Sequence, residues 1–319
     1  MANQTETFIV ILVGFPGLPQ RLYGLVSVLM FLIYMASLLA NGTVILLVIL
    51  KANLHQPMYV LIANLAISDL LFDTITLPKL IAKYWFGNGT MTFSACLLQM
   101  FLVHYFGSID SFIIMLMAID RYVAICKPLR YSAIITKKVL ALSCTFSWVV
   151  LATFPALTSV TLNSQIIFCD NITNKINSCF CTNIGVTSLS CTDITFVKQI
   201  VFGLAMVALL VPLSFILLSY IIIIKTIRSS TRSENWQKAF HTCTTHLLVI
   251  ILYYVPRVFV YSANQVKLII DADINVLILC LYTFVPHVAN PIIYCLRTKE
   301  IKEMFGHLLE KNRLRVMDV

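Results

Sequence analysis

Long apolar stretches alternate with short polar segments along this chain. A helix needs roughly 20 mostly apolar residues to cross the hydrocarbon core of a bilayer. Seven stretches reach this length, so the pattern predicts seven membrane-spanning helices. They run over Leu22 to Leu50, Pro57 to Tyr84, Ala95 to Ile125, Lys138 to Val160, Phe196 to Ile227, Trp236 to Ser262 and Ile274 to Cys295.

Basic residues next to these stretches predict which ends face the cytosol. Cytosolic loops are enriched in Lys and Arg, and a large set of such residues falls on one side of the predicted membrane. The set is Lys51, Lys127, Arg130, Lys137, Lys138, Lys225, Arg228, Arg232, Lys238, Arg297, Lys299 and Lys302. We therefore expect a multi-pass plasma-membrane protein with an extracellular N-terminus and a cytosolic C-terminus. The sequons at Asn3, Asn88 and Asn171 lie in predicted outside segments and are candidate glycosylation sites.

The end of the chain carries a different pattern. From Thr298 to Leu309 charged residues alternate with apolar ones, which favours a short helix lying along the inner leaflet. The expected fold is an all-α membrane protein, a seven-transmembrane helix bundle with a short amphipathic cytosolic helix after the seventh span. The predicted divisions are an extracellular N-terminus (1–21), the seven-transmembrane domain (22–297) and the amphipathic helix with the cytosolic C-terminus (298–319).

Composition supports this class and excludes others. Of the 319 residues 59% are hydrophobic and 12% are charged, and the mean hydropathy is +0.89, which a soluble domain of this length does not show. The excess of basic over acidic residues, 23 against 14, indicates orientation in the membrane, and no nucleic-acid motif accompanies it. Neither a nucleophile motif nor a phosphate-binding loop is present, so we expect no enzyme and no catalytic cofactor. The first span is expected to act as an uncleaved signal anchor.

The segment Met115 to Tyr131 places the charged pair Asp120 and Arg121 at the end of an apolar helix. Ionisable groups in membrane helices are costly, rare and usually functional. The pair is therefore predicted to form a polar lock at the cytosolic edge. Snorkelling of Arg121 to the interface is the simpler alternative, but it does not account for the neighbouring acid.

Seven spans with Asp120-Arg121-Tyr122 closing the third resemble the rhodopsin-like G-protein-coupled receptors. Longer motifs narrow the resemblance to olfactory receptors, and they follow one another through the whole chain. These motifs are LHQPMY from Leu54, MAIDRYVAICKPLRY from Met117, SY at Ser219, KAFHTC from Lys238 and PHVANPIIY from Pro286. Ala40 and His241 depart from the family pattern, which usually has glycine and serine there.

The resemblance implies an odorant receptor. A small-molecule ligand in the outer half of the bundle would activate a stimulatory, olfactory-type heterotrimeric G protein and raise cyclic AMP. The residues implied in the switch are Asp120, Arg121, Tyr122, Tyr220 and Tyr294. The basic inner loops suit G-protein docking and also contact with membrane lipid. One alternative is a rhodopsin-like receptor for an endogenous lipid acid or hormone; a transporter or channel would need inverted repeats or interrupted spans, which the sequence does not show.

The resemblance also implies disulfide pairs. The top of the third span is usually linked to the loop between spans four and five, and a second bond forms within that loop. This assigns Cys96 to Cys181 and Cys169 to Cys191 and leaves Cys179 extra, although Cys179 as the partner of Cys96 stays open. The remaining cysteines are expected to be free packing residues: Cys126, Cys144, Cys243, Cys280 and Cys295.

Two acids are predicted to meet inside the bundle. Asp110 precedes Arg121 by eleven residues and Asp69 follows the inner-edge Met58 by eleven, so both lie roughly 16 Å from the inner edge. Like charges in a low dielectric cannot both stay ionised without a cation between them. The resemblance implies a sodium ion here, with Asn41 and Asn290 nearby. The alternative is one protonated acid hydrogen-bonded to the other.

The outer half of the bundle is predicted to hold the ligand. His104, Gly107 and Ser108 lie about 20 to 26 Å above the inner edge on the third span. Tyr254, Arg257 and Tyr261 are expected to share one face of the sixth span, beyond a bend at Pro256.

Arg257 is the informative residue, because a guanidinium in an apolar helix needs a partner and a carboxylate is the strongest one. Either it anchors an acidic ligand, or it snorkels outward or pairs with Asp271 or Asp193. The segment GFPGLP from Gly14 resembles the branch of the family that detects water-soluble odorants, which favours an acid. His55, His241, His246 and His287 have no carboxylate or cysteine at metal-ligand spacing and are expected to be structural.

Overall fold

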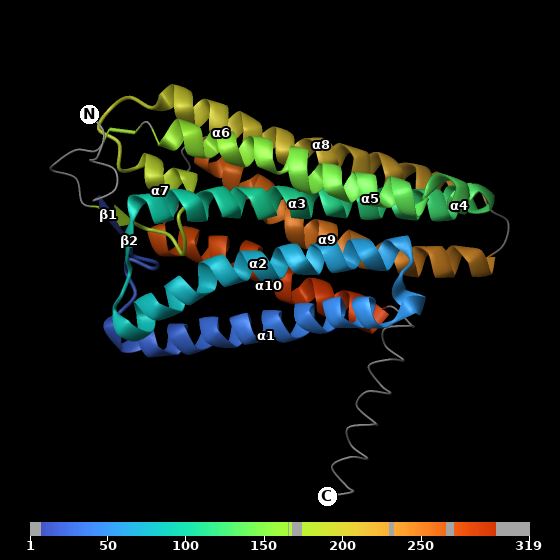
Figure 1. The fold of residues 1–319 in the computed structure, drawn as a ribbon, viewed down its shortest axis with the longest axis horizontal. Helices are drawn as coiled ribbons and strands as arrows, with labels where there is room; N and C mark the ends of the chain where they lie inside the picture. Colours follow the sequence, from blue (N-terminus) through green and yellow to red (C-terminus); the bar gives the residue numbers. More distant parts are fainter. Residues whose placement is uncertain (1–7, 165, 168–173, 230–232, 266–270, 298–319) are drawn as a thin grey trace, which may run out of the picture.

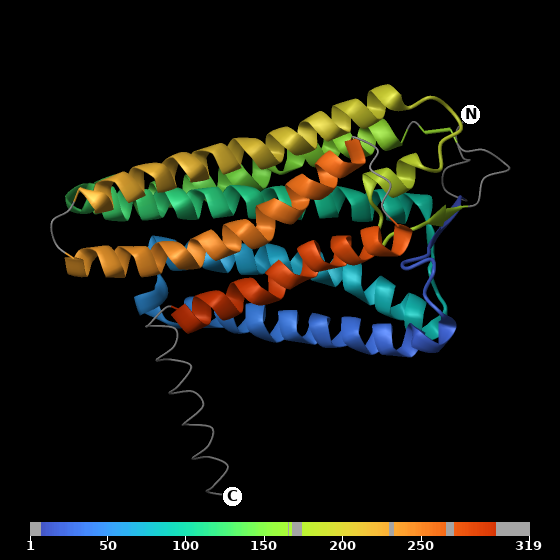
Figure 2. The same ribbon diagram turned by 180° about the vertical axis from the view of Figure 1, so that it is seen from behind.

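The computed structural model describes residues 8–164, 166–167, 174–229, 233–265 and 271–297. Long helices run side by side along the molecule (Figures 1 and 2). Among the described residues, six helical crossings are long and apolar enough to span a membrane, and a seventh contains the shorter apolar segment Leu247–Ala263. The predicted seven-helix bundle is therefore confirmed. The amphipathic helix predicted after the seventh span lies outside the described residues.

Six crossings are single helices: α1 (Tyr23–Leu50), α2 (Pro57–Phe86), α3 (Phe93–Cys126), α8 (Thr195–Arg228), α9 (Ser233–Gln265) and α10 (Ala272–Arg297). The fourth crossing is composite: α5 (Lys137–Phe146) continues through a π-helical segment, Ser147–Leu151, into α6 (Thr153–Asn163). Short elements join the crossings: the 3-10 helices Gln20–Leu22, Ala52–Leu54 and Pro128–Arg130, and the helices α4 (Tyr131–Ile134) and α7 (Asn183–Thr187).

Local sequence explains where several helices begin and end. Pro57 opens α2 at the first helical turn, where its missing N–H costs nothing. The hydroxyl of Thr92 accepts a hydrogen bond from the Ala95 N–H at the start of α3, and Thr136 accepts one from Val139 at the start of α5. Gly87 ends α2 with a φ of 72°, in the left-handed region that favours glycine.

One end of the molecule carries a small sheet that the apolar pattern did not predict. Its strands are β1 (Ile9–Leu12), β2 (Thr90–Thr92) and β3 (Lys175–Ile176), in the order β2-β1-β3. β1 pairs antiparallel with β2 and parallel with β3. We call this the outer end, in keeping with the orientation expected from the basic residues, and the opposite end the inner end.

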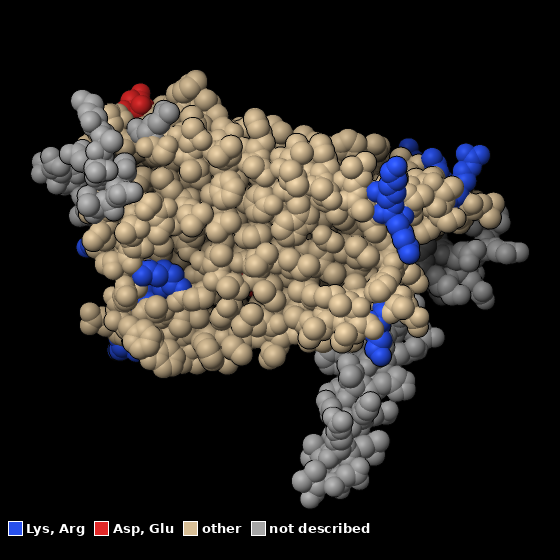
Figure 3. Space-filling model, in the orientation of Figure 1, with Lys and Arg blue, Asp and Glu red and all other residues tan. Residues whose placement is uncertain are grey.

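The lateral surface is apolar, while polar side chains gather inside. Large apolar side chains such as Leu25, Leu39 and Leu142 are about two-thirds exposed, as expected for residues that face lipid. The middle of the face in Figure 3 shows no charged residue, and basic residues lie at both ends of the molecule, including the inner end that bears α4. Asp69, Asp73, Asp110 and His287 are almost completely buried. Helix α3 packs against α2, α6 and α8, so its polar residues face the interior of the bundle.

The cysteines confirm one predicted bond and correct another prediction. Cys96 and Cys181 are disulfide-bonded, with their Cα atoms 5.5 Å apart. Cys179 is not extra and Cys280 is not free, because these two residues form a second disulfide. The prediction failed because the loop after β3 passes between α3 and α10, so that it can be linked to both. Cys126 and Cys144 are free, as expected. Cys191 is disulfide-bonded, but its predicted partner Cys169 lies outside the described residues.

Candidate functional site

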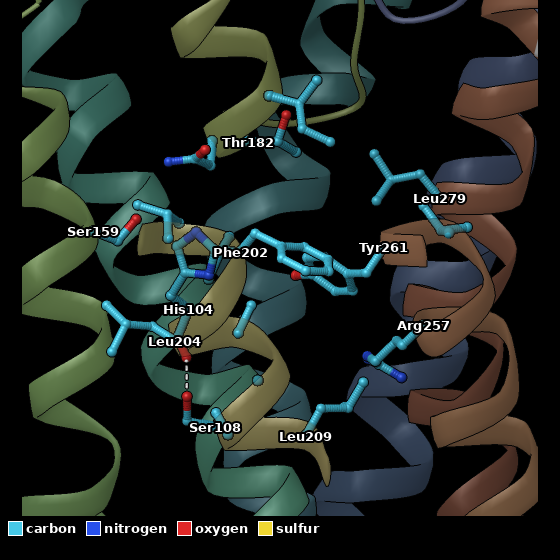
Figure 4. A pocket seen from close by; sticks show the side chains of 18 of the residues that line it. His104, Ser108, Ser159, Thr182, Phe202, Leu204, Leu209, Arg257, Tyr261 and Leu279 are labelled. Atoms are coloured by element: carbon cyan, nitrogen blue, oxygen red, sulfur yellow. Dashed lines mark hydrogen bonds between the residues drawn. The ribbon is translucent and has the colours of Figure 1, made fainter. Parts of the chain in front are cut away.

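A cavity of about 700 Å³ opens in the outer half of the bundle. Helices α3, α6, α8, α9 and α10 surround it, and residues of α7 and the preceding loop close its outer side (Figure 4). Five of the six residues predicted to bind a ligand line it: His104, Gly107, Ser108, Arg257 and Tyr261. Drug-sized ligands occupy cavities of about 300 to 1,000 Å³, so the volume suits a small organic molecule.

Tyr254, the sixth predicted residue, does not line the cavity, and Tyr253 takes its place. Residues four apart lie on the same face of a helix, and Tyr253 is four residues before Arg257. The hydroxyl of Tyr254 instead lies 2.8 Å from the hydroxyl of Ser111 on α3. Tyr253 donates a hydrogen bond to the carbonyl of Gly107 at 2.5 Å. Both tyrosines thus connect α9 to α3, but only Tyr253 faces the cavity.

Arg257 is buried, with 7% of its surface exposed. Its Nη1 donates to the carbonyl of Tyr253 at 3.0 Å, and its guanidinium carbon lies 3.7 Å from the centre of the Tyr253 ring. Tyr282 contributes a second ring at 5.4 Å. Within the described part of the chain no carboxylate oxygen lies within 4 Å of this guanidinium. The guanidinium therefore faces the cavity and packs against the ring of Tyr253.

The two acids considered as partners for Arg257 are engaged elsewhere. Asp271 accepts hydrogen bonds from the backbone N–H groups of Asp273 and Ile274 at the start of α10. Asp193 accepts from the hydroxyl and the N–H of Thr195, and these bonds lower the pKa of its carboxyl. Neither pairing with Asp271 or Asp193 nor snorkelling to the surface describes Arg257 in this structure.

Asp69 and Asp110 meet at one depth, as counting along the helices predicted. His287 lies between them, and ligand atoms of the three residues all fall within 4.8 Å of one another. Its Nε2 is 3.5 Å from Asp69 Oδ1 and 3.8 Å from Asp110 Oδ2. The spacing of acids along the chain gave no sign of this cluster, because the acids come from helices far away in sequence. The structural role expected for His287 stays a prediction.

Further polar side chains surround this cluster. Asp73, which was not predicted from the sequence, lies 2.7 Å from Nδ1 of His287 and accepts a hydrogen bond from the Ser37 hydroxyl. Its position four residues after Asp69 on the same helix face was the available signal. Asn290 donates to Asp69 Oδ2 at 3.1 Å, and Asn41 donates to the carbonyl of His287 at 3.0 Å. Both asparagines are thus near the acids, as predicted.

The donor set fits the implied sodium ion only in part. Hard cations take oxygen ligands, which Asp69 and Asp110 supply. The imidazole nitrogen of His287, however, stands next to the same two carboxylates, and imidazole suits transition metals and zinc. Sodium binding stays a prediction.

At the inner end, Asp120 contacts two residues. Its Oδ2 is 4.0 Å from Nε of Arg121, and its Oδ1 accepts a hydrogen bond of 2.6 Å from the Tyr131 hydroxyl. Burial and this hydrogen bond raise the pKa of the Tyr131 hydroxyl, so it stays protonated and remains the donor. The lock between Asp120 and Arg121 was expected from the sequence, but the contribution of Tyr131 was not.

The other predicted switch residues also lie near the inner end. The ring of Tyr122 is 5.8 Å from Nζ of Lys127. Tyr220 on α8 and Tyr294 on α10 are both buried, and the Tyr294 hydroxyl lies 3.8 Å from the sulfur of Met117 on α3. Helices α3, α8 and α10 therefore place Arg121, Tyr220 and Tyr294 in the same inner region of the bundle.

Comparisons with known proteins agree on one family. A family model described as olfactory receptor matches residues 30–312. The chain is 34% identical to Olfactory receptor 2AT4 of Homo sapiens over 303 residues, which cover 94% of this chain and 92% of the relative. It is 35% identical to the human Olfactory receptor 52B6, covering 98% and 93%, and 36% identical to the human Olfactory receptor 13C2, covering 97% of each.

Proposed function

The chain belongs to the olfactory receptor family, and we propose that it responds to a small carboxylic acid that Arg257 holds in the outer cavity. Family membership makes it a multi-pass G-protein-coupled receptor and not an enzyme. Its partners are a small molecule and a heterotrimeric G protein. The ligand class, the type of G protein and the second messenger are the parts we propose.

A buried cation with no carboxylate oxygen within 4 Å among the described residues supports the acid most directly. Arg257 is desolvated, and an arginine can bind a carboxylate through two parallel hydrogen bonds. A charged partner within the low-dielectric cavity recovers much of the energy lost by burying the guanidinium. The aromatic rings of Tyr253 and Tyr282 restrict the orientation of the cation, and His104 and Ser108 supply further polar groups across the cavity.

Ligand binding is proposed to reach the inner end through a shift between two arrangements of the helices. A ligand shifts this equilibrium only if it binds the active arrangement more tightly. In the resting arrangement Asp120 restrains Arg121. In the active arrangement Arg121 is released towards the G protein, and Tyr220 and Tyr294 change their contacts. We propose coupling to a stimulatory, olfactory-type G protein that raises cyclic AMP.

The test is a cyclic AMP screen of cells that express the receptor at their surface. Each carboxylic acid is compared with the alcohol, methyl ester and amine of the same carbon skeleton. The expected result is activation by one or more acids and by none of their matched neutral or basic analogues. Activation by the neutral analogues alone would contradict the proposal.

Substitution of Arg257 makes the test specific. Arg257→Leu is expected to reduce the potency of the active acid by at least about thirty-fold, since truncating one partner of a buried charge pair costs about 2 to 5 kcal/mol. Lys198→Met is the matched control, because Lys198 also lines the cavity but is exposed, and exposed charges contribute little. Equal loss in both variants, or unchanged potency in Arg257→Leu at normal surface expression, would refute the role of Arg257.

A further inference from the structure

We propose that Asp69, Asp110 and His287 form a binding site for one divalent cation of the zinc class. The site lies in the core of the bundle, below the cavity. It differs from the predicted sodium site by the imidazole ligand, and it does not depend on the identity of the odorant.

The distances within the cluster fit ligands of a shared ion better than hydrogen bonds. Nε2 of His287 is 3.5 Å from Asp69 and 3.8 Å from Asp110, beyond the 2.7 to 3.2 Å that is typical of N–H···O hydrogen bonds. Zinc binds nitrogen and oxygen at about 2.0 to 2.2 Å in tetrahedral sites, which places neighbouring ligand atoms roughly 3.4 Å apart. One central ion could therefore contact all three side chains after small adjustments.

The atoms that face this position lack other partners. Oδ1 of Asp69, both carboxylate oxygens of Asp110 and Nε2 of His287 are buried and make no hydrogen bond with the described residues. Ser68, whose hydroxyl neighbours Asp110, donates to the carbonyl of Phe106 at 3.3 Å. Buried polar atoms nearly always form hydrogen bonds. Atoms that meet only at the longer ion-pair distances of 3.5 and 3.8 Å therefore leave room for a shared ligand.

The charge and chemistry of the ligands favour a divalent transition-type cation. With a neutral His287 the carboxylates of Asp69, Asp73 and Asp110 carry three negative charges, of which a dication balances two and a single alkali cation balances one. Imidazole nitrogen suits zinc and its neighbours in the first transition row, and not a hard alkali ion. Asp73 accepts from Nδ1 of His287 at 2.7 Å, and such a carboxylate typically fixes the tautomer of a metal-binding histidine so that Nε2 faces the metal.

A route to the site leads through the outer cavity. Phe72 lines the cavity, and its ring centre lies 5.0 Å from that of the His287 imidazole. Ser111, the residue after Asp110, also lines the cavity. Movement of the Phe72 side chain would therefore let a cation pass from the cavity to the cluster.

The experiment uses the purified full-length receptor in lipid nanodiscs, stripped with chelator and then titrated with ZnCl₂. Wild-type receptor is expected to show a saturable rise in unfolding temperature. Titration with CoCl₂ reports on the ligands directly, since cobalt in a tetrahedral nitrogen and oxygen site absorbs visible light. We expect one cobalt ion per receptor.

Three variants identify the ligands. His287→Gln is expected to weaken zinc affinity by at least a hundred-fold, and Asp73→Asn by about ten- to a hundred-fold through loss of the group that orients the imidazole. His55→Gln is the matched control, because His55 is an exposed histidine in a loop of the inner end, and it should bind zinc like wild type. If His287→Gln does not fold, the ligands are tested instead with Asp110→Asn and with the cobalt spectrum of the wild type.

The alternative that the test must exclude is a protonated His287 serving as the internal cation. In that case the unfolding temperature would depend on pH but not on zinc, and the proposal would be overturned. A response to NaCl without one to ZnCl₂ would overturn it as well. Equal zinc binding by wild type and His287→Gln would show that zinc binds elsewhere, and the proposal would again be overturned.

Discussion

The guanidinium of Arg257 lies against the ring of Tyr253, and this contact determines how the cation faces the cavity. A cation over a desolvated aromatic ring gains about 2 kcal/mol. The backbone of the same tyrosine accepts a hydrogen bond from Arg257, and its hydroxyl donates to Gly107 on α3. The ring and the hydroxyl therefore have separable roles, one in holding the cation and one in connecting two helices.

Substitutions of Tyr253 separate these roles. Tyr253→Phe keeps the ring and removes one hydrogen bond worth about 0.5 to 1.5 kcal/mol, so we expect lower thermal stability with acid potency within about three-fold. Tyr253→Leu removes the ring beneath the guanidinium and should lower acid potency by about ten-fold or more. Dose–response curves and unfolding temperatures measure the two effects. Equal potency losses in the two variants would argue against the ring as the support for Arg257.

Single residues also show the limit of sequence reasoning. The depth of Asp69 and Asp110 could be predicted because the rise of a helix is fixed, and a count of residues gives a height. The role of His287 could not, because it depends on how α10 is rotated about its axis against α2 and α3. For the same reason the choice between Tyr253 and Tyr254 required the structure, since one residue turns a side chain by about 100° around the helix.

At the scale of elements, the loop after β3 is held between two helices. Cys181 links it to Cys96 on α3, and two residues earlier Cys179 links it to Cys280 on α10. The backbone N–H of Cys181 also donates to Gln99 on α3 at 2.9 Å. Residues of this loop, including Phe180 and Thr182, line the cavity. The two disulfides therefore fix the outer wall of the binding site against two crossings.

A digest without reduction should contain a peptide pair joined through Cys179 and Cys280. Replacing both cysteines with serine should lower the unfolding temperature by several degrees, because a disulfide typically contributes about 2 to 4 kcal/mol. Cys144→Ser, which removes a buried free thiol, is the control and should have a smaller effect. Recovery of Cys179 as an alkylated free thiol before reduction would contradict the bond.

At the scale of the whole molecule, the bilayer makes much of the fold predictable. Every backbone polar group must be paired inside lipid, so apolar stretches of this length become helices, and their number and approximate bounds follow from hydropathy alone. The sheet escaped prediction because strands of two to four residues, such as β3, carry no periodic signal. The place of the cavity could be predicted, but its lining from α6, α8 and α10 could not, because packing sets how these helices are rotated.

The orientation of the molecule can be tested at its outer end. Asn88 is exposed beside the sheet, and its side chain contacts Thr90 and Lys79. Asn88→Gln should remove one glycan that glycosidase treatment releases from the wild type. A tag on the C-terminus should be accessible to antibody only after the cells are permeabilised. Antibody binding to that tag on intact cells would reverse the orientation inferred from the basic loops.

The place of β1 in the sheet has a consequence for biosynthesis. The strand leaves the ribosome first, but β2 emerges only after two crossings and β3 only after four. The three-stranded sheet can therefore be completed only after four crossings have been synthesised, when β3 becomes available to pair with β1. The outer end of the receptor should consequently be completed late in maturation. Before β3 emerges, quality control in the secretory pathway acts on a receptor whose binding site is still incomplete.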